Sequence, residues 1–206
     1  MDQSELFSSP PRRGPSRKFK AVLAGGLALG VGAAITLAAW NDSEFASGTF
    51  AAGSFEIEGS TDGTTFGDHE PAASAATLAF ALDANKLAPD EPVYAAFAVQ
   101  LKAGSTNAAS VSIAASSAAP IAGSLNYSLV STATFGCDAA AFAGGVALVT
   151  DAATTTSSAA GIIPLVAVST PVDLCFRVTP STSLPPGTAS GSVLWEFTAV
   201  STTPIP

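Results

Sequence analysis

Apolar and polar or small residues alternate with a period of two over much of the chain after residue 50. The clearest stretch is 93–101, where every odd-numbered residue from Val93 to Leu101 is apolar. Such alternation places the apolar side chains on one face of a β-strand. The pattern predicts about eight strands, at residues 55–58, 78–82, 93–101, 111–113, 125–129, 146–149, 172–178 and 193–197.

The predicted strands are separated by residues that are typical of turns, mainly Gly, Ser, Asn and Pro. Pro186-Gly187 favours a type II turn, since proline restricts φ and glycine accepts a positive φ. Residues 138–160 are rich in alanine and could contain a short helix, although Gly144-Gly145 would interrupt it. Evenly spaced short strands predict an all-β sandwich or barrel.

The first forty residues have a different composition. Residues 1–20 are polar and basic and are expected to be disordered, whereas 21–39 (AVLAGGLALGVGAAITLAA) carry no charge. As a helix the second segment would be about 28 Å long, close to the thickness of the hydrocarbon core of a bilayer. Its length favours a transmembrane helix, but its glycines and terminal small residues favour a cleaved signal peptide. Under both alternatives residues 40–206 form an extracellular domain.

Charge is distributed unevenly between these two parts. Five of the eight basic residues precede residue 21. Beyond Ala39, three basic residues stand against fourteen acidic ones, which gives a formal charge of −11. Binding to nucleic acid depends on Lys and Arg that neutralise phosphate, so this composition excludes DNA or RNA as a partner of the main domain.

Cys137 and Cys175 are the only cysteines. In an exported chain a lone pair predicts one disulfide, whereas a chain retained in the cytoplasm would keep two separate thiols. Closing the loop between them would contribute roughly 4 kcal/mol to stability in the chain-entropy treatment.

The stretch ITLAAWNDSEFASGTFAAGSFEIEGS resembles the export signal and mature start of the TasA and camelysin family. The residues that carry the resemblance are Ala38-Ala39, Trp40-Asn41-Asp42, Ser47-Gly48-Thr49 and Phe55-Glu56-Ile57-Glu58. The resemblance implies cleavage by a SipW-type signal peptidase after Ala39 or one residue away, at the junction of Ala38, Ala39 and Trp40. It also implies a jelly-roll β-sandwich. A second stretch, KLAPDEPVYAAFAVQLKAGSTNAASVSIAA, is similar to a recurring family pattern but has Asp90 directly after Pro89 where the family has glycine.

The sequence contains few residues that indicate catalysis. His69 is the single histidine, and neither HExxH nor GxSxG occurs. Asp62, Asp68 and Glu70 could surround a cation together with His69, but a solvated acidic turn explains them better because the ligand spacing of an EF-hand is missing. The sequence therefore predicts no catalytic, cofactor or metal site, and no enzyme.

Three functions remain to be compared. The first is a secreted or cell-surface structural protein that forms fibres, with the new N-terminus as a strand donated to the next subunit, as the family resemblance implies. The second is a monomeric binding module anchored by residues 21–39, and the third is a surface hydrolase. The first hypothesis makes self-association and the signal peptidase the expected partners, with the membrane as a partner before processing. Its candidate donor strand comprises Trp40, Asn41, Asp42, Phe45, Phe50 and Phe55.

Overall fold

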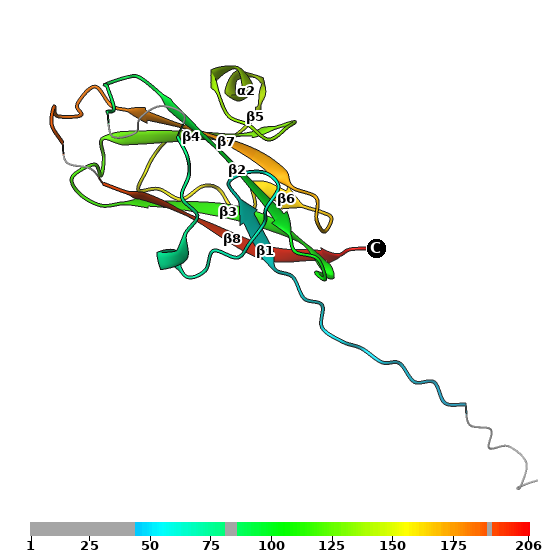
Figure 1. The fold of residues 1–206 in the computed structure, drawn as a ribbon. Coiled ribbons are helices and arrows are strands. Elements are labelled where there is room, and N and C mark those ends of the chain that lie inside the picture. The colour runs from blue at the N-terminus through cyan, green and yellow to red at the C-terminus, as the bar shows by residue number, and fades with distance from the viewer. Residues whose placement is uncertain (1–43, 81–85, 189–190) are drawn as a thin grey trace, which may run out of the picture. The chain divides into compact units, whose positions relative to one another are not determined.

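The structure is a computed structural model that describes residues 44–80, 86–188 and 191–206. It confirms an all-β fold in which two antiparallel sheets stack face to face (Figure 1). One sheet has five strands in the order β1-β2-β7-β4-β5, and the other has three in the order β6-β3-β8. The strands are β1 (Ile57–Ser60), β2 (Val93–Leu101), β3 (Asn107–Ser117), β4 (Leu125–Thr132), β5 (Val146–Ala153), β6 (Ile163–Leu165), β7 (Val172–Pro180) and β8 (Val193–Pro204).

The pairing of the strands is that of a jelly roll with one pair missing. A jelly roll arises when a long hairpin is rolled up, so that the first strand pairs with the eighth, the second with the seventh, the third with the sixth and the fourth with the fifth. The last three pairs are present here, as β2–β7, β3–β6 and β4–β5. The first pair is not formed, because β1 pairs only with β2 and β8 pairs only with β3 in the described chain.

The core lies between the two sheets and follows the alternation in the sequence. From β3 it receives Val111 and Ile113, and from β7 it receives Leu174 and Phe176, all of which are almost fully buried. At about 25 cal/mol per Å² of apolar surface removed from water, each such side chain stabilises the fold by roughly 1.5–3 kcal/mol. Burial of these alternating residues therefore determines which face of each strand is turned inward.

Two predicted elements differ from the structure. The expected strand at 78–82 is not formed over its described part, 78–80, and residues 81–85 lie outside the description. Leu78 and Phe80 still pack against the core, but no backbone hydrogen bond joins residues 76–80 to another described strand. Conversely, β6 was not predicted, because Pro164 interrupts a run of only three residues. The short helix within 138–160 is α2 (Ala139–Gly144), which ends at the glycine pair.

The chain divides into two compact units, Met1–Phe50 and Ala51–Pro206. The second unit contains both sheets. Of the first, the structure describes only residues 44–50, so the predicted basic segment 1–20, the apolar segment 21–39 and the predicted cleavage residues Ala38, Ala39 and Trp40 lie outside the description. Within the described residues no helix is long and apolar enough to cross a bilayer.

Candidate assembly site

The N-terminal segment, defined here as residues 44–53, contains no helix or strand and is exposed throughout. Phe45 and Phe50 are 92% and 94% exposed, which is unusual for large apolar side chains. Phe55 behaves differently, since it packs against the core of its own domain. Trp40, Asn41 and Asp42 of the predicted donor strand lie outside the described residues. Among the described residues of the predicted donor strand, Phe45 and Phe50 are therefore the exposed aromatic ones.

An extended strand made from the N-terminal segment would have two unlike faces. Because successive side chains alternate, Phe45 and Phe50 would point to opposite sides. The face of Phe50 also carries Ala46, Gly48 and Ala52, with Glu44 at its N-terminal end, whereas the face of Phe45 carries the hydroxyl residues Ser47 and Thr49. The Phe50 face is thus the one suited to an apolar surface.

Residues 54–56 attach the N-terminal segment to the loop between β2 and β3. Ser54 accepts a hydrogen bond from the backbone N–H of Thr106 (2.8 Å), and its own N–H donates to the Thr106 hydroxyl (2.8 Å). The Lys102 ammonium contacts the Glu56 carboxylate at 2.6 Å. Because Thr106 O accepts from the N–H of Ile205 (2.9 Å), just after β8, the segment leaves the domain beside the C-terminal end of β8.

Four strands lie at sheet edges, and three of them are poor templates for an added strand. β1 has four residues, and its Gly59 already pairs with Gly67. β5 shows two irregularities in its register with β4 and has Asp151 at a φ of 46°. β6 has three residues and includes Pro164, which has no N–H to donate. Bulges, short strands and proline are the features with which proteins protect edges from association.

The edge of β8 carries none of these protections over most of its length. β8 has twelve residues, its register with β3 is regular from Val193 to Ser201, and proline occurs only at position 204. Its single charged residue, Glu196, is exposed. A long, regular edge of this kind is the type of surface to which an extended peptide adds.

The backbone groups of β8 that point to the free edge can be identified. Ile113 and Ala115 of β3 direct their backbone groups away from β8, toward Ser158 and Thr156. In an antiparallel ladder the bonding direction alternates, so the even-numbered residues of β3 bond to their partners on β8. These partners are Leu194, Glu196, Thr198 and Val200. The N–H and C=O groups of the odd-numbered residues therefore face the free edge, and these residues are Val193, Trp195, Phe197 and Ala199.

The same odd-numbered residues of β8 face the core but are only half-buried. On β3, the residues opposite Ala199, Phe197 and Trp195 are nearly fully buried, and these are Val111, Ile113 and Ala115. Trp195 packs against Phe176 (5.1 Å between ring centroids) and Tyr127 (6.0 Å). Its indole nitrogen and the hydroxyl of Tyr127 are buried and have no hydrogen-bond partner among the described residues. Burial raises the pKa of the Tyr127 phenol. The core is thus incompletely covered along β8.

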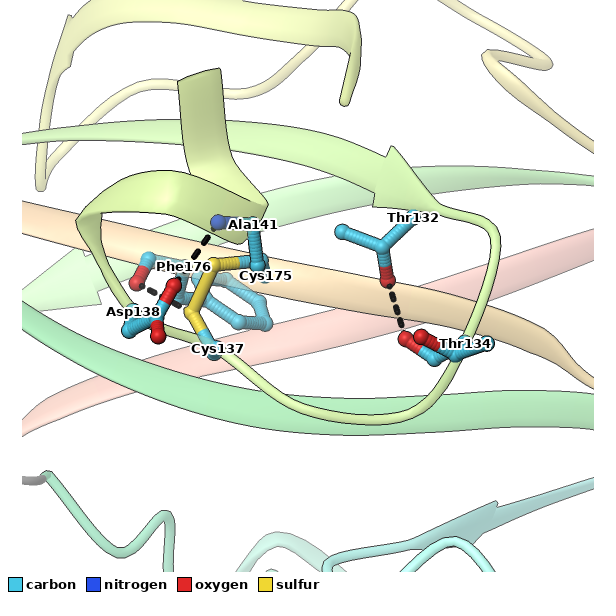
Figure 2. The surroundings of a disulfide bond; sticks show 7 residues. All are labelled: Thr132, Thr134, Cys137, Asp138, Ala141, Cys175 and Phe176. Carbon is cyan, nitrogen blue, oxygen red and sulfur yellow. Dashed lines mark hydrogen bonds between the residues drawn. A yellow bond between two sulfur atoms is a disulfide. The ribbon is translucent and has the colours of Figure 1, made fainter. Parts of the chain in front are cut away.

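Residues 133–145, called here the disulfide flap, cover part of the outer face of the five-stranded sheet. The predicted disulfide between Cys137 and Cys175 is confirmed (Figure 2). Cys175 alternates with the core residues Leu174 and Phe176 and therefore points to the outer face of the five-stranded sheet, yet it is fully buried. Cys137 Sγ lies 3.3 Å from the Phe176 carbonyl oxygen, a close contact rather than a hydrogen bond, because a disulfide sulfur carries no hydrogen. The flap thus provides a second covering layer.

Helix α2 is capped within the flap and contacts the sheet through the side chain of Phe142. The carboxylate of Asp138 accepts a hydrogen bond from the N–H of Ala141 (2.7 Å), which caps the helix N-terminus (Figure 2). The guanidinium of Arg177 lies 4.4 Å from the ring centre of Phe142 and donates to the Ser128 hydroxyl at 3.1 Å. No role was predicted for Arg177 or Phe142, because they lie 35 positions apart in the sequence and become neighbours only in the folded chain.

The acidic turn at 60–70 is organised by its own hydrogen bonds. Asp62 accepts from the backbone N–H groups of Thr65 (2.6 Å) and Thr64 (2.8 Å) and from the Ser60 hydroxyl (2.9 Å). These bonds hold the pKa of Asp62 well below its usual range. Among the described residues no group of three His, Cys, Asp or Glu side chains is arranged to hold a metal ion. We therefore interpret the turn as a structural element that is held together by the hydrogen bonds of Asp62.

The fold and these surfaces define an antiparallel β-sandwich with one open sheet edge and an extended N-terminal segment. The chain matches no protein-family model and no curated protein.

Proposed function

We propose that this protein is an exported structural subunit of the cell surface or extracellular matrix, which assembles into fibres after a signal peptidase releases its N-terminus. The observation that carries the proposal is the exposed N-terminal segment with its two nearly fully exposed phenylalanines. An extended apolar segment on a sheet protein can be exchanged between subunits by strand addition, in which main-chain hydrogen bonds supply affinity. The resemblance to the TasA and camelysin family supports the same mode of assembly.

The disulfide supports the extracellular location. Disulfides persist in oxidising environments and are rare in reducing cytosol. The acidic surface is also consistent with export, since it disfavours anionic lipid and nucleic acid as partners. Cleavage near Trp40 would act as the trigger for assembly, because a segment that is still joined to a membrane-inserted leader cannot be transferred to a neighbouring subunit.

The proposal is tested by comparing the full chain with a chain that begins at Trp40. Sequencing the N-terminus of the naturally secreted product should give a start at or next to Trp40. The shortened chain should polymerise in sedimentation and electron microscopy, whereas the full chain in detergent should stay monomeric. Phe50→Ser in the shortened chain is the matched control, because it changes one exposed side chain, leaves the domain intact and should weaken polymerisation.

Two results would contradict the proposal. One is a shortened chain that remains monomeric at high concentration. The other is a membrane fraction in which residues 21–39 are retained on all of the protein, which would favour the anchored binding module instead.

A further inference from the structure

We propose that the outer face of the five-stranded sheet, next to the disulfide flap, binds a neutral sugar ring of a polysaccharide. The residues of this site are called here the outer-face cluster, and they are Tyr94, Asn126, Phe142, Asp151, Arg177 and Thr179. The proposal goes beyond fibre assembly. From the proposed function it uses only the location outside the cell, where polysaccharides are available as partners.

The strand register brings most of the cluster together. Tyr94 of β2 lies opposite Arg177 of β7, which in turn lies opposite Ser128 of β4. Two residues further along the same face, Thr179 of β7 lies opposite Asn126 of β4. These side chains alternate with core residues on their strands and therefore point to the outer face. All of them except the buried Ser128 are partly exposed.

Arg177 is a cation without an ionic partner in the described chain. Its guanidinium donates to Ser128 Oγ at 3.1 Å, and no described carboxylate forms an ion pair with it. Of the five N–H groups of a guanidinium, this is the only one that has an acceptor among the described residues. Nε is buried without an acceptor, whereas Nη1 reaches the surface. Because acidic residues outnumber basic ones by fourteen to three beyond Ala39, an arginine that pairs with none of them points to an acceptor outside the chain.

Two aromatic rings lie beside this guanidinium. It is 4.4 Å from the ring centre of Phe142, a residue of helix α2, which lies over the outer face of the sheet (Figure 1). The rings of Phe142 and Tyr94 are 6.0 Å apart. Tyr94 is partly exposed, and tyrosine provides a rigid surface that is apolar on the ring and polar at the hydroxyl. Such a surface suits a sugar, whose C–H groups form apolar patches between its hydroxyls.

The polar groups beside Arg177 include both donors and acceptors. Asn126 Nδ2 donates to Asp151 Oδ1 at 3.1 Å, which leaves the Asn126 amide oxygen and Asp151 Oδ2 without a donor in the described chain. The hydroxyls of Thr179 and Tyr94 form no hydrogen bond with a described residue. Each sugar hydroxyl both donates and accepts, so a mixed set of free groups suits a polyol. A carboxylate ligand fits less well, because Asp151 and the formal charge of −11 repel it.

A buried hydroxyl connects the two charged residues of the cluster. Ser128 Oγ accepts from the backbone N–H of Asp151 (2.9 Å) as well as from Arg177. Asp151 has a φ of 46°, a conformation that aspartate adopts more readily than most residues. Both charges are therefore in place before a ligand arrives, and binding requires little further ordering. Contact with the flap through Phe142 explains the position of Arg177 but not that of Asp151.

The test measures binding of the full chain by isothermal titration calorimetry, in a detergent without a sugar headgroup. The neutral probes are soluble α-glucan, β-glucan, mannan and galactan, and the anionic probes are polygalacturonate and polyglutamate. Arg177→Gln removes the cation, Thr179→Val removes a hydroxyl, and Asp151→Asn removes a charge from a residue with positive φ. Thr198→Val is the matched control, because it removes an exposed hydroxyl from the outer face of the other sheet. Circular dichroism and urea midpoints establish that each variant is folded.

At least one neutral polysaccharide should bind, and its affinity should change less than about twofold between low and high salt, because no ligand charge is neutralised. Arg177→Gln should weaken binding about tenfold or more, and Thr179→Val about threefold, because hydrogen bonds to charged groups contribute more than neutral ones. Asp151→Asn should also weaken binding, whereas Thr198→Val should bind like the wild type.

Binding to none of the neutral probes would overturn the proposal. So would binding that Arg177→Gln, Asp151→Asn and Thr179→Val leave unchanged, and if Arg177→Gln does not fold, the other two variants decide the question. Binding of polygalacturonate or polyglutamate alone, with loss at high salt, would assign the cluster to a carboxylate and also overturn it. These results are independent of whether the shortened chain polymerises, so failure here leaves the proposed function standing.

Discussion

Removal of the disulfide provides a quantitative test of how the disulfide flap contributes to stability. Cys137 and Cys175 are 38 positions apart and join the flap to a central strand of the five-stranded sheet. Constraining a loop of that length in the unfolded chain corresponds to about 4 kcal/mol at 25 °C in the chain-entropy treatment. Since domains are usually stable by about 5–15 kcal/mol, the loss would be a large part of the total.

The suitable variant is Cys137→Ala with Cys175→Ala. Serine would be a poor choice at position 175, because that side chain is fully buried and an unpaired hydroxyl there would add a cost of its own. The cation–π contact between Arg177 and Phe142 remains in the variant and should keep the flap on the sheet in the folded state. The expected change is therefore a lower midpoint of urea unfolding, with an m-value equal to or larger than that of the wild type because the unfolded chain is less constrained.

Equilibrium urea unfolding followed by circular dichroism measures this change. The free energy of unfolding should fall by about 4 kcal/mol from its wild-type value when either a reductant or the double substitution removes the disulfide. Reductant added to the double variant is the control and should have no effect. A loss below about 1 kcal/mol would refute the reasoning, because it would mean that the disulfide does not constrain the unfolded chain appreciably. An m-value that rises in the variant would show that the unfolded chain exposes more surface once it is released.

Two further substitutions test particular side chains of the domain. Tyr127→Phe removes a buried hydroxyl that has no partner in the part of the chain that the structure describes. The free energy of unfolding in thermal or urea melts should therefore stay the same or rise by up to about 1 kcal/mol, and a clear loss would show that the hydroxyl is paired. Asp62→Asn removes a carboxylate whose pKa is lowered in the folded state by the N–H groups of Thr65 and Thr64. Such a group stabilises the fold above its unfolded pKa and loses this effect as the pH falls toward the folded value. The variant should therefore be less stable than wild type at pH 7, and the difference should narrow below about pH 4 in melts at a series of pH values. A difference that does not change with pH would contradict the assignment.

Local alternation was sufficient to predict most of the fold. The bounds of β2 agree with the prediction at both ends, because the odd-numbered residues from Val93 to Leu101 are apolar without interruption and all of them are buried. The expected strand at 78–82 shows the limit of this signal. Its alternating side chains do pack on the core, but a strand also needs a neighbour for its backbone groups, and alternation contains no information about that neighbour.

The candidate site was predicted only in part. The sequence indicated the N-terminal segment, because a stretch rich in small residues follows a possible cleavage point. It did not indicate β8 as an open edge, and it ended that strand at Phe197, because the alternation is weak in the threonine-rich part from Thr198 to Thr203. The β-branched residues of that part were the signal that could have extended the prediction.

The sequence by itself determined the fold class, the inward faces of the strands, the acidic character of the domain and the presence of one pair of cysteines. These properties depend on residue type and on spacing along the chain. The tertiary structure alone decided that β1 pairs with β2, that β8 has no jelly-roll partner among the described residues, and that Arg177 contacts Phe142. Strand order and such contacts depend on which distant segments become neighbours, and this is set by the packing of the whole core rather than by any local pattern.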